Sequence, residues 1–282
     1  MFKIGVIHNV NIEQRYFSMK NRKKVEYFYL QNSLIKKFQR YLFVGSFISF
    51  EYNGDKRIVD GIEAYPIEHF ISIIRKHRFR REVFYDISVI REGIKDFFLS
   101  LGNIMFLDVE MTMQSYYSPK NFKPEIIQAG FLITNKEGED LERKNYYIKP
   151  TVFKQINRRT LKFLGLKETV FNNAIGFKDF YNEFKGYLEK YKPFVIVWGK
   201  NDILAFKDAY KLNDLKPLTI NFVNLLQIHK NYYNLKEDLG LFKAYTMYTG
   251  KKYEQDHNAA EDADVTKKVY YEFKQIVCEN EE

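Results

Sequence analysis

Two carboxylates occupy alternate positions of a short apolar segment. Asp108 and Glu110 lie within residues 104–111, where the other residues are all apolar. Because side chains on a strand alternate between its faces, both carboxylates should project to one side, and Leu107 and Val109 to the other. Neighbouring like charges on a hydrophobic strand favour a bound cation, and their hard oxygen ligands suit Mg²⁺ or Mn²⁺. An edge strand whose polar face meets water would show the same pattern.

A third carboxylate follows the most apolar segment of the C-terminal half. Residues 194–199 read Phe-Val-Ile-Val-Trp-Gly, which is typical of a buried central strand, and Asp202 falls in the first turn of the helix predicted to follow. Helix starts favour anions, and the ends of strands in open α/β sheets are where ligands bind. A residue that only caps the helix would be favoured by the same electrostatics.

A histidine and a fourth carboxylate lie near the C-terminus. His257 precedes a predicted helix, and Asp262 lies in the first turns of that helix. The small residues between them should let the start of the helix pack closely against a sheet. An isolated histidine is more often structural, but a helix-borne aspartate five residues later favours a catalytic pair.

Length and composition limit the class of protein. The chain has 282 residues, enough for one large domain or two ordinary ones, and 45% of them are hydrophobic. No run of 18 or more apolar residues is present and the N-terminus lacks a signal-peptide pattern, so we expect a cytoplasmic protein with no membrane partner. Cys278 is the only cysteine, which excludes an intrachain disulfide or a cysteine-based zinc cluster. The oligomeric state stays open.

Positive charge is concentrated in the N-terminal third. Of the net charge of +9, residues 1–100 carry +7, from 18 Lys and Arg against 11 Asp and Glu, whereas residues 101–282 carry +2. This distribution favours a polyanionic partner for the N-terminal part. An ordinary solvated basic surface is the alternative.

The first 70 residues predict a small all-β domain, either a barrel or a sandwich. The dipeptide Asn53-Gly54 is a strong hairpin signal between strands at 47–52 and 58–65. The other predicted strands are short aromatic and β-branched runs at residues 3–10, 15–19 and 25–30.

Part of this region resembles a cold-shock domain, which has an OB-type barrel. Residues 25–33 and 42–51 are similar to the second half of that family, and residues 15–19 sit where it carries its first aromatic RNA-binding strand. The resemblance implies exposed aromatic side chains on which unpaired bases stack, flanked by cations that follow the phosphates. The candidates are Tyr16, Phe17, Tyr27 and Tyr29. Each of them could instead be a core residue.

Residues 71–101 predict a helical linker between two domains. Pro66 should end the β pattern, after which Ile67, Phe70, Ile71 and Ile74 recur at helical spacing. A basic run at residues 75–81 contains one aromatic residue, and we interpret it as a solvated linker rather than a phosphate-binding patch. A second amphipathic helix begins after Asp86 and ends near Gly102.

Residues 102–282 predict an α/β domain. Strands come first and helices follow, an order that suits a mixed sheet with flanking helices. The strands are expected at residues 104–111, 126–134, 144–148 and 194–199, and the helices at 158–164, 177–191, 202–210, 225–232, 239–248 and 259–277.

The four carboxylates and the histidine resemble the signature of the DEDDh exonucleases, the His-containing branch of the DEDD family. Asp108 and Glu110 match its first motif, Asp202 its second, and His257 with Asp262 its third, His-x4-Asp. The resemblance covers about residues 102–278 and implies a ribonuclease H-like fold. Two segments look most like the RNA-trimming sub-branch of the family, namely Trp198-Gly199 and residues 221–226.

The resemblance also implies roles for these residues. The four carboxylates would hold two divalent ions, Mg²⁺ or Mn²⁺, for an in-line hydrolysis of a phosphodiester, and His257 would be the general base. Met111 and Thr112 are expected to contact the terminal nucleotide, although many relatives have a small residue or threonine in the place of Met111. Glu261 and Asp264 lie about 100° and 200° around the helix from Asp262, so neither should share its ion.

Our hypothesis is a 3′→5′ exonuclease that hydrolyses single-stranded RNA to nucleoside 5′-monophosphates. The basic N-terminal domain would hold the strand and feed its end to the metal site. A DNA exonuclease with proofreading or repair duties is the nearest alternative, because the sugar is recognised by local hydrogen bonds to the 2′-hydroxyl. A non-catalytic RNA-binding protein is disfavoured because all five catalytic-type residues are present.

Overall fold

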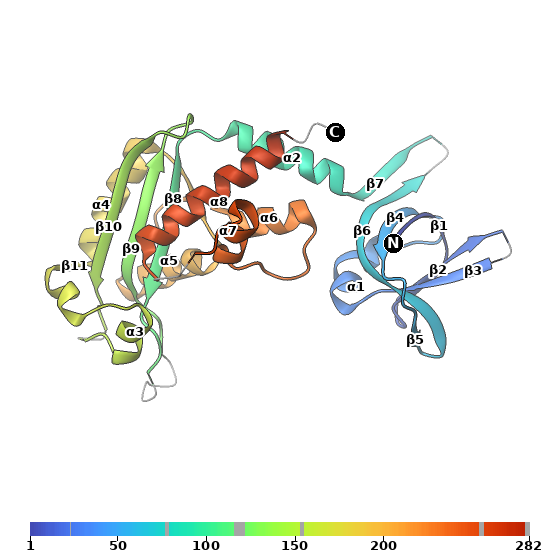
Figure 1. The fold of residues 1–282 in the computed structure, drawn as a ribbon, viewed down its shortest axis with the longest axis horizontal. Coiled ribbons are helices and arrows are strands. Elements are labelled where there is room, and N and C mark those ends of the chain that lie inside the picture. Colours follow the sequence, from blue (N-terminus) through green and yellow to red (C-terminus); the bar gives the residue numbers. More distant parts are fainter. Residues whose placement is uncertain (23, 77–78, 116–121, 153–154, 254–256, 280–282) are drawn as a thin grey trace. The chain divides into compact units, whose positions relative to one another are not determined.

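The structure is a computed structural model that describes residues 1–22, 24–76, 79–115, 122–152, 155–253 and 257–279. It divides into two compact units, residues 1–92 and 93–282, and the division falls inside helix α2 (Figure 1). Helix α2 spans Ile87–Ser100. Across the described parts of the chain, every helix is too short or too polar to cross a membrane.

The first unit is a closed β-barrel, which confirms the predicted small all-β domain and is consistent with an OB type. Neighbouring strands follow the order β3-β2-β1-β4-β6, and a parallel pairing of β3 with β6 closes the barrel. Helix α1 (Asn32–Phe38), which the sequence analysis did not predict, follows β3 and buries Leu34, Ile35 and Phe38. The strands are β1 (Phe2–Asn11), β2 (Tyr16–Asn21), β3 (Lys24–Tyr29), β4 (Phe47–Tyr52), β5 (Arg57–Val59), β6 (Ile62–Lys76) and β7 (Arg81–Asp86).

The predicted helix at residues 67–74 is wrong, because this segment belongs to the long strand β6. Two bulges interrupt its pairing with β4, between Ile67 and His69 and again between Phe70 and Ser72. Each bulge adds one residue, so the buried side chains Ile67, Phe70 and Ile73 follow one another at intervals of three. This spacing imitates a helical repeat.

A helical linker is therefore absent from most of the stretch where it was predicted. The residues up to Lys76 and those from Arg81 to Asp86 form the hairpin β6–β7, and a helix begins only at Ile87. His77 and Arg78 of the basic run lie outside the described residues.

The predicted hairpin at Asn53-Gly54 is also wrong. Strand β4 pairs with the later part of β6, while β5 pairs with the beginning of β6, with Val59 opposite Ile62. The tight turn is Asp60-Gly61, whose φ angles of 47° and 80° are both positive, as a two-residue hairpin turn requires.

The second unit contains a six-stranded mixed sheet, which confirms the ribonuclease H-like fold. Its strands follow the order β11-β10-β9-β8-β12-β13, with β8–β9 and β9–β10 antiparallel and β8–β12 and β12–β13 parallel. The strands are β8 (Ile104–Met111), β9 (Ile126–Thr134), β10 (Asp140–Lys149), β11 (Ile175–Gly176), β12 (Phe194–Val197) and β13 (Asn221–Asn224).

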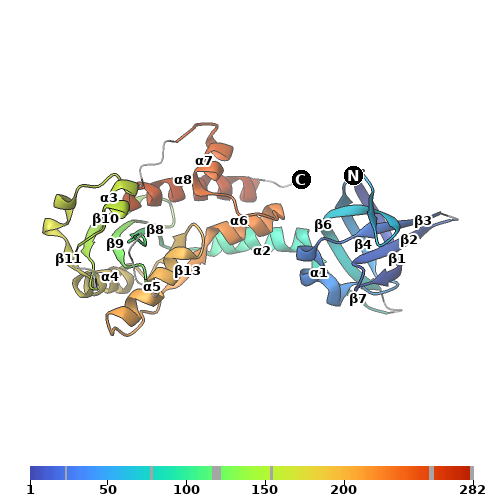
Figure 2. The same cartoon turned by 90° about the horizontal axis from the view of Figure 1, so that it is seen from below.

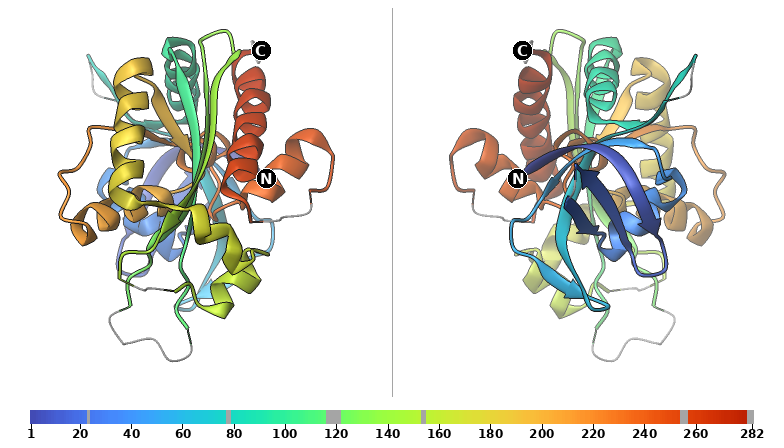
Figure 3. Two further views of the ribbon diagram at one scale, coloured as in Figure 1. Left: turned by 90° about the vertical axis from the view of Figure 1, so that its left-hand side faces the viewer. Right: turned by 90° about the vertical axis from the view of Figure 1, so that its right-hand side faces the viewer.

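Helices cover both faces of this sheet. Figure 3 shows α4 on one face and α8 on the other. Phenylalanines at helical spacing in α4, Phe177, Phe180 and Phe184, are buried against the sheet together with α5. Helix α7 packs on α8, as Figure 2 also shows. The helices are α3 (Arg158–Phe163), α4 (Phe177–Tyr191), α5 (Asn201–Leu212), α6 (Leu225–Tyr233), α7 (Leu241–Thr249) and α8 (Ala259–Glu279).

Candidate active site

Strand β8 presents its two carboxylates to one face of the sheet. Leu107 and Val109 are buried in the core that α4 and α5 cover. Phe106, on the other face, contacts Tyr270 of α8 at 5.4 Å between ring centroids. Asp108 and Glu110 share the face of Phe106, so they lie on the side of the sheet that α8 covers. The predicted alternation along β8 is confirmed.

Gly130 allows α8 to start directly on the sheet. It pairs with Asp108 across β8 and β9. A Cβ atom at this glycine would come within 2.1 Å of the backbone nitrogen of Ala260 and within 2.3 Å of the carbonyl carbon of Ala259. Only glycine permits this approach, which brings the beginning of α8 next to the carboxylates of β8. The sequence analysis missed Gly130, although a glycine inside a strand pattern often marks a close backbone approach.

The turn before α8 fixes His257. This residue has a φ of 46°, in the left-handed region that side chains other than glycine rarely adopt. The next residue, Asn258, accepts hydrogen bonds at Oδ1 from the N–H of Ala260, at 3.1 Å, and from Nε2 of Gln128, at 3.2 Å. Gln128 lies opposite Glu110 in the sheet, so the turn is tied to the strand pair that carries the carboxylates.

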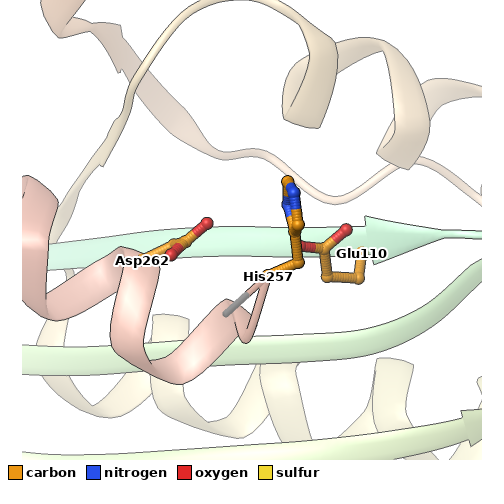
Figure 4. A group of neighbouring side chains, drawn as sticks. All are labelled: Glu110, His257 and Asp262. Carbon is orange, nitrogen blue, oxygen red and sulfur yellow. The ribbon is translucent and has the colours of Figure 1, made fainter. Parts of the chain in front are cut away.

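Three of the predicted residues meet closely. One donor atom from each of Glu110, His257 and Asp262 lies within 4.8 Å of the donor atoms of the other two (Figure 4). His257 Nδ1 is 3.9 Å from Oε1 of Glu110. The ring of Phe163, which the sequence analysis did not single out, lies 4.1 Å from the imidazole between centroids.

The other two carboxylates border this cluster. Asp202 is buried at the start of α5, and its Oδ1 accepts a hydrogen bond of 3.1 Å from the N–H of Val109, which ties α5 to β8. Asp108 and Asp262 line a cavity of about 490 Å³. Its other lining residues are Trp198 and the start of α7 from Gly240 to Lys243.

Burial raises the pKa values of all four carboxyl groups, and repulsion by neighbouring carboxylates raises those of Asp108, Glu110 and Asp262 further. Burial is the main cause for each, and it raises the pKa of Glu110 to about 8, of Asp262 to about 7 and of Asp202 to about 6. The pKa of Asp108 is raised well above its usual value by burial and then by the charges of Asp202, Asp262 and Glu110. A divalent cation would relieve this repulsion, and the carboxylate oxygens suit a hard ion. Burial lowers the pKa of His257, so its imidazole is neutral at pH 7.

The neighbouring acids of α8 have other partners. Asp264 forms a two-pronged ion pair with the guanidinium of Arg143, on β10. Glu261 accepts a hydrogen bond of 3.4 Å from the hydroxyl of Tyr253. Neither acid belongs to the group of donor atoms around His257.

The predicted nucleotide contacts at and just after the end of β8 are not both accessible. Met111 is partly buried against the core of the unit. Thr112 is buried, and its N–H and Oγ1 pair with the backbone C=O and N–H of Glu125, each at 2.9 Å. The side chain of Thr112 therefore fixes the end of the strand pair.

The aromatic platform predicted for the first unit is only partly present. Phe17 is fully buried and lies 5.6 Å from Phe28, and Tyr16 is also buried, so neither is an exposed stacking residue. The two tyrosines of β3, Tyr27 and Tyr29, are half-buried on the outer side of the barrel. Arg15 lies over the ring of Tyr29, at 5.3 Å from the centroid. The first four residues of β2 are all buried, so the sequence shows no alternation of apolar and polar residues that could tell an exposed Tyr16 from a buried Phe17.

Comparisons with known proteins find similar exonucleases. The Bacillus subtilis protein named "Probable 3'-5' exonuclease KapD" is 27% identical over 167 residues, which cover 58% of this chain and 81% of the relative. The nuclease domain of 3'hExo, a DEDDh family member bound to rAMP, is similar with a TM-score of 0.57 and 18% identity, over 64% of this chain and 95% of that domain. A 3'-exonuclease solved for its recognition of a histone mRNA stem-loop gives a TM-score of 0.56 and 16% identity, over 64% of this chain and 84% of its own.

A family model described as exonuclease, of the RNase T type, matches residues 105–270. The match includes every residue of the carboxylate and histidine cluster. The chain therefore belongs to the RNase T family of exonucleases, and its site has the residues of the DEDDh type.

Proposed function

We propose that this protein is a metal-dependent 3′→5′ exonuclease that releases nucleoside 5′-monophosphates from single-stranded RNA. The observation that carries the proposal is the convergence of Glu110, His257 and Asp262, with Asp108 and Asp202 beside them, on one side of the sheet. The direction of hydrolysis follows the printed name of the Bacillus subtilis relative.

The four carboxylates would hold two divalent ions, Mg²⁺ or Mn²⁺. Asp108 and Asp262 border one cavity, and Glu110 and Asp202 flank them. The raised pKa values of Asp108 and Glu110 arise from burial and from neighbouring carboxylates, and a bound cation would lower both pKa values. Such ions, when bound, stabilise the charge that develops on the attacking and leaving oxygens of a phosphodiester.

The residues of the chain have separate tasks in this proposal. His257 accepts the proton of the attacking water, since its lowered pKa keeps the imidazole unprotonated at pH 7. Asp202 keeps the end of β8 in place through its hydrogen bond to Val109. The turn at Asn258 holds the imidazole within 3.9 Å of Glu110.

RNA is favoured over DNA as the substrate. The support is that two similar structures are described with ribonucleotides, one with rAMP and one with a histone mRNA stem-loop. Sequence identities of 16–18% show a shared fold and not a shared substrate, so a DNA exonuclease is the second candidate. The N-terminal barrel would hold the strand, with Tyr27 and Tyr29 as candidate stacking residues.

Digestion of 5′-labelled RNA and DNA oligonucleotides of matched sequence tests the proposal. With Mg²⁺ or Mn²⁺ we expect a ladder that shortens from the 3′ end and is faster on RNA, and no products in EDTA. Equal or faster digestion of DNA would overturn the RNA preference, and internal cleavage would overturn the exonuclease assignment.

A pair of neighbouring substitutions tests the site itself. Asp262→Asn should lower hydrolysis by more than about 100-fold, because it removes a metal ligand rather than a group that only orients one. Asp264→Asn on the same helix should leave most of the activity, since Asp264 pairs with Arg143 outside the cluster. Wild-type activity in Asp262→Asn would remove this residue from the site.

A further inference from the structure

A row of cations and aromatic rings crosses one part of the outer surface of the barrel. Arg40 lies over the ring of Tyr41 at 5.0 Å from its centroid. Tyr41 stacks on Phe84 at 5.4 Å, and Phe84 in turn lies 6.0 Å from Phe43. Arg75 lies over Phe43 at 5.3 Å. These five residues, from the 3-10 helix η1 (Gln39–Tyr41) to the hairpin β6–β7, are called the cation–aromatic row below.

A further cation–aromatic contact lies beside the row, between β6 and β4. Lys76 lies over the ring of Phe47 on β4, at 4.4 Å from its centroid. Arg80 and Arg81, which follow in the hairpin, are exposed, and Phe79 before them has 91% of its surface exposed. Arg75, Lys76 and Arg81 of the basic run therefore lie in strands β6 and β7 rather than in a linker.

The cations of the row differ from others on the barrel in their partners. Lys3 lies 2.5 Å from Glu26 and Lys56 lies 2.8 Å from Glu63, so carboxylates already neutralise these two lysines. Among the described residues, no ion pair joins Arg40, Arg75 or Lys76 to an acid. Their charge is held over aromatic rings, where it stays available to an anion.

The chemistry of the row suits one class of ligand. Phe43 has 39% of its surface exposed, and bases stack on aromatic rings and on guanidinium planes alike. Exposed arginines and lysines beside such rings bind phosphates. Only single-stranded nucleic acid offers unpaired bases and regularly spaced phosphates together.

We infer that the cation–aromatic row and Lys76 form a binding surface for single-stranded nucleic acid, separate from the tyrosines of β3. This inference rests on the proposed action on single-stranded nucleic acid. The oligonucleotide face generally used by OB folds lies on the second and third strands, whereas the row is built from η1, the segment before β4 and the β6–β7 hairpin. The surface adds affinity and takes no part in hydrolysis.

Binding of a 20-nucleotide fluorescent RNA to the full chain in EDTA, measured by anisotropy over a range of salt concentrations, tests the inference. The double variant R75A/K76A should lower the slope of log affinity against log salt by about 1.4, because each lost phosphate contact on a single strand contributes roughly 0.7. At 0.1 M salt we expect a loss of affinity on the order of tenfold. The matched control is K3A/K56A, which removes two charges already paired with acids.

Phe43→Ala examines stacking separately from charge. Its affinity should fall by roughly 5- to 100-fold with an unchanged salt slope, since stacking does not release counterions. Because Phe43 is exposed, its replacement should leave the barrel folded, and thermal melting of each variant checks this.

The outcomes separate this inference from the proposed function. An equal loss of salt slope in both double variants would show that only net charge matters. Wild-type binding by R75A/K76A and by Phe43→Ala would show that the row binds no strand. Either result overturns the inference. Hydrolysis of RNA by the wild type together with such results would leave the proposed function standing. Loss of binding in the row variants, together with no hydrolysis by the wild type, would support the binding surface and overturn the proposed function.

Discussion

His257 is the residue whose role differs most from that of its neighbours. The carboxylates attract cations, whereas the imidazole has a lowered pKa and can accept a proton at neutral pH. Its Nδ1 lies 3.9 Å from Oε1 of Glu110, which is too far for a hydrogen bond. The close packing of Phe163 on the ring excludes water from one face of it. A general base and not a ligand is the role that this arrangement favours.

Replacement of His257 should therefore affect turnover and not affinity. His257→Ala should lower kcat by about 10²–10⁴-fold, the usual contribution of a general base, while metal and substrate affinities remain. Rate measurements from pH 5 to 9 should show that the acidic limb of the wild-type profile disappears, and that raised pH restores part of the mutant rate. An unchanged acidic limb would assign the proton transfer to another group, and unfolding would indicate a structural histidine.

His229 has a stability role that the sequence analysis did not predict. It is fully buried in α6, and neither ring nitrogen has a hydrogen-bond partner among the described residues. The rings of Tyr233 and Phe273 lie 4.9 and 5.2 Å from it. Burial lowers the pKa of His229 to about 4 from 6.5. The fold thus accepts only the neutral imidazole.

This burial predicts a loss of stability in acid. Because the unfolded chain takes up the proton first, the stabilisation is complete above about pH 6.5 and is lost as the pH falls towards 4, by about 3 kcal/mol in total. His229→Phe should abolish that part of the pH dependence, as urea unfolding at pH 7.5, 6 and 5 would measure. The active-site carboxyls act in the opposite direction but are common to both proteins. Parallel pH curves would contradict the prediction.

At the scale of elements, the contact of α8 with β9 decides whether the site exists. Gly130 and the first residues of α8 touch through backbone atoms, so the position of Asp262 and His257 depends on this one contact. A methyl group there has no space, and the neighbouring atoms are backbone rather than flexible side chains.

Gly130→Ala should consequently separate activity from folding. Overpacking should cost about 1–3 kcal/mol of stability, while hydrolysis should fall much further because α8 moves away from β8. Thermal melting and rate measurements on the same preparation check this. Gly186→Ala is the control, since a Cβ atom at that position in α4 meets nothing within 4 Å and alanine favours a helix by about 0.5–1 kcal/mol. Full activity in Gly130→Ala would contradict the role of this contact.

The elements also show how far sequence can predict this fold. Strands β8 and β9 and helix α4 have the predicted bounds, because their apolar runs and periodicity are undisturbed. The family signature placed the five site residues, yet the contacts that hold them come from Gly130, Gln128 and Asn258, whose partners are distant in sequence. Strand β6 was misassigned because bulges, which depend on the pairing with β4, changed its repeat.

At the scale of the molecule, helix α2 connects the units but its second half belongs to the nuclease. Phe98 is fully buried and lies 5.3 Å from Tyr270 and 5.5 Å from Phe273, both on α8. Phe97 contacts Phe194 on β12 at 6.3 Å. The core of the second unit therefore needs residues that precede Gly102.

Two truncated chains test where the nuclease begins. A chain that starts at Ile87 keeps all of α2 and should fold and hydrolyse short oligonucleotides as the full chain does, with weaker and less salt-dependent binding of long strands. A chain that starts at Gly102 lacks Phe98 and should lose about 3–5 kcal/mol of stability, the usual cost of deleting a buried phenylalanine side chain. Urea unfolding and RNA digestion of both chains are the measurements. Equal stability of the two would place the boundary after α2, and unchanged binding of long strands by the longer one would leave the barrel without a role in holding RNA.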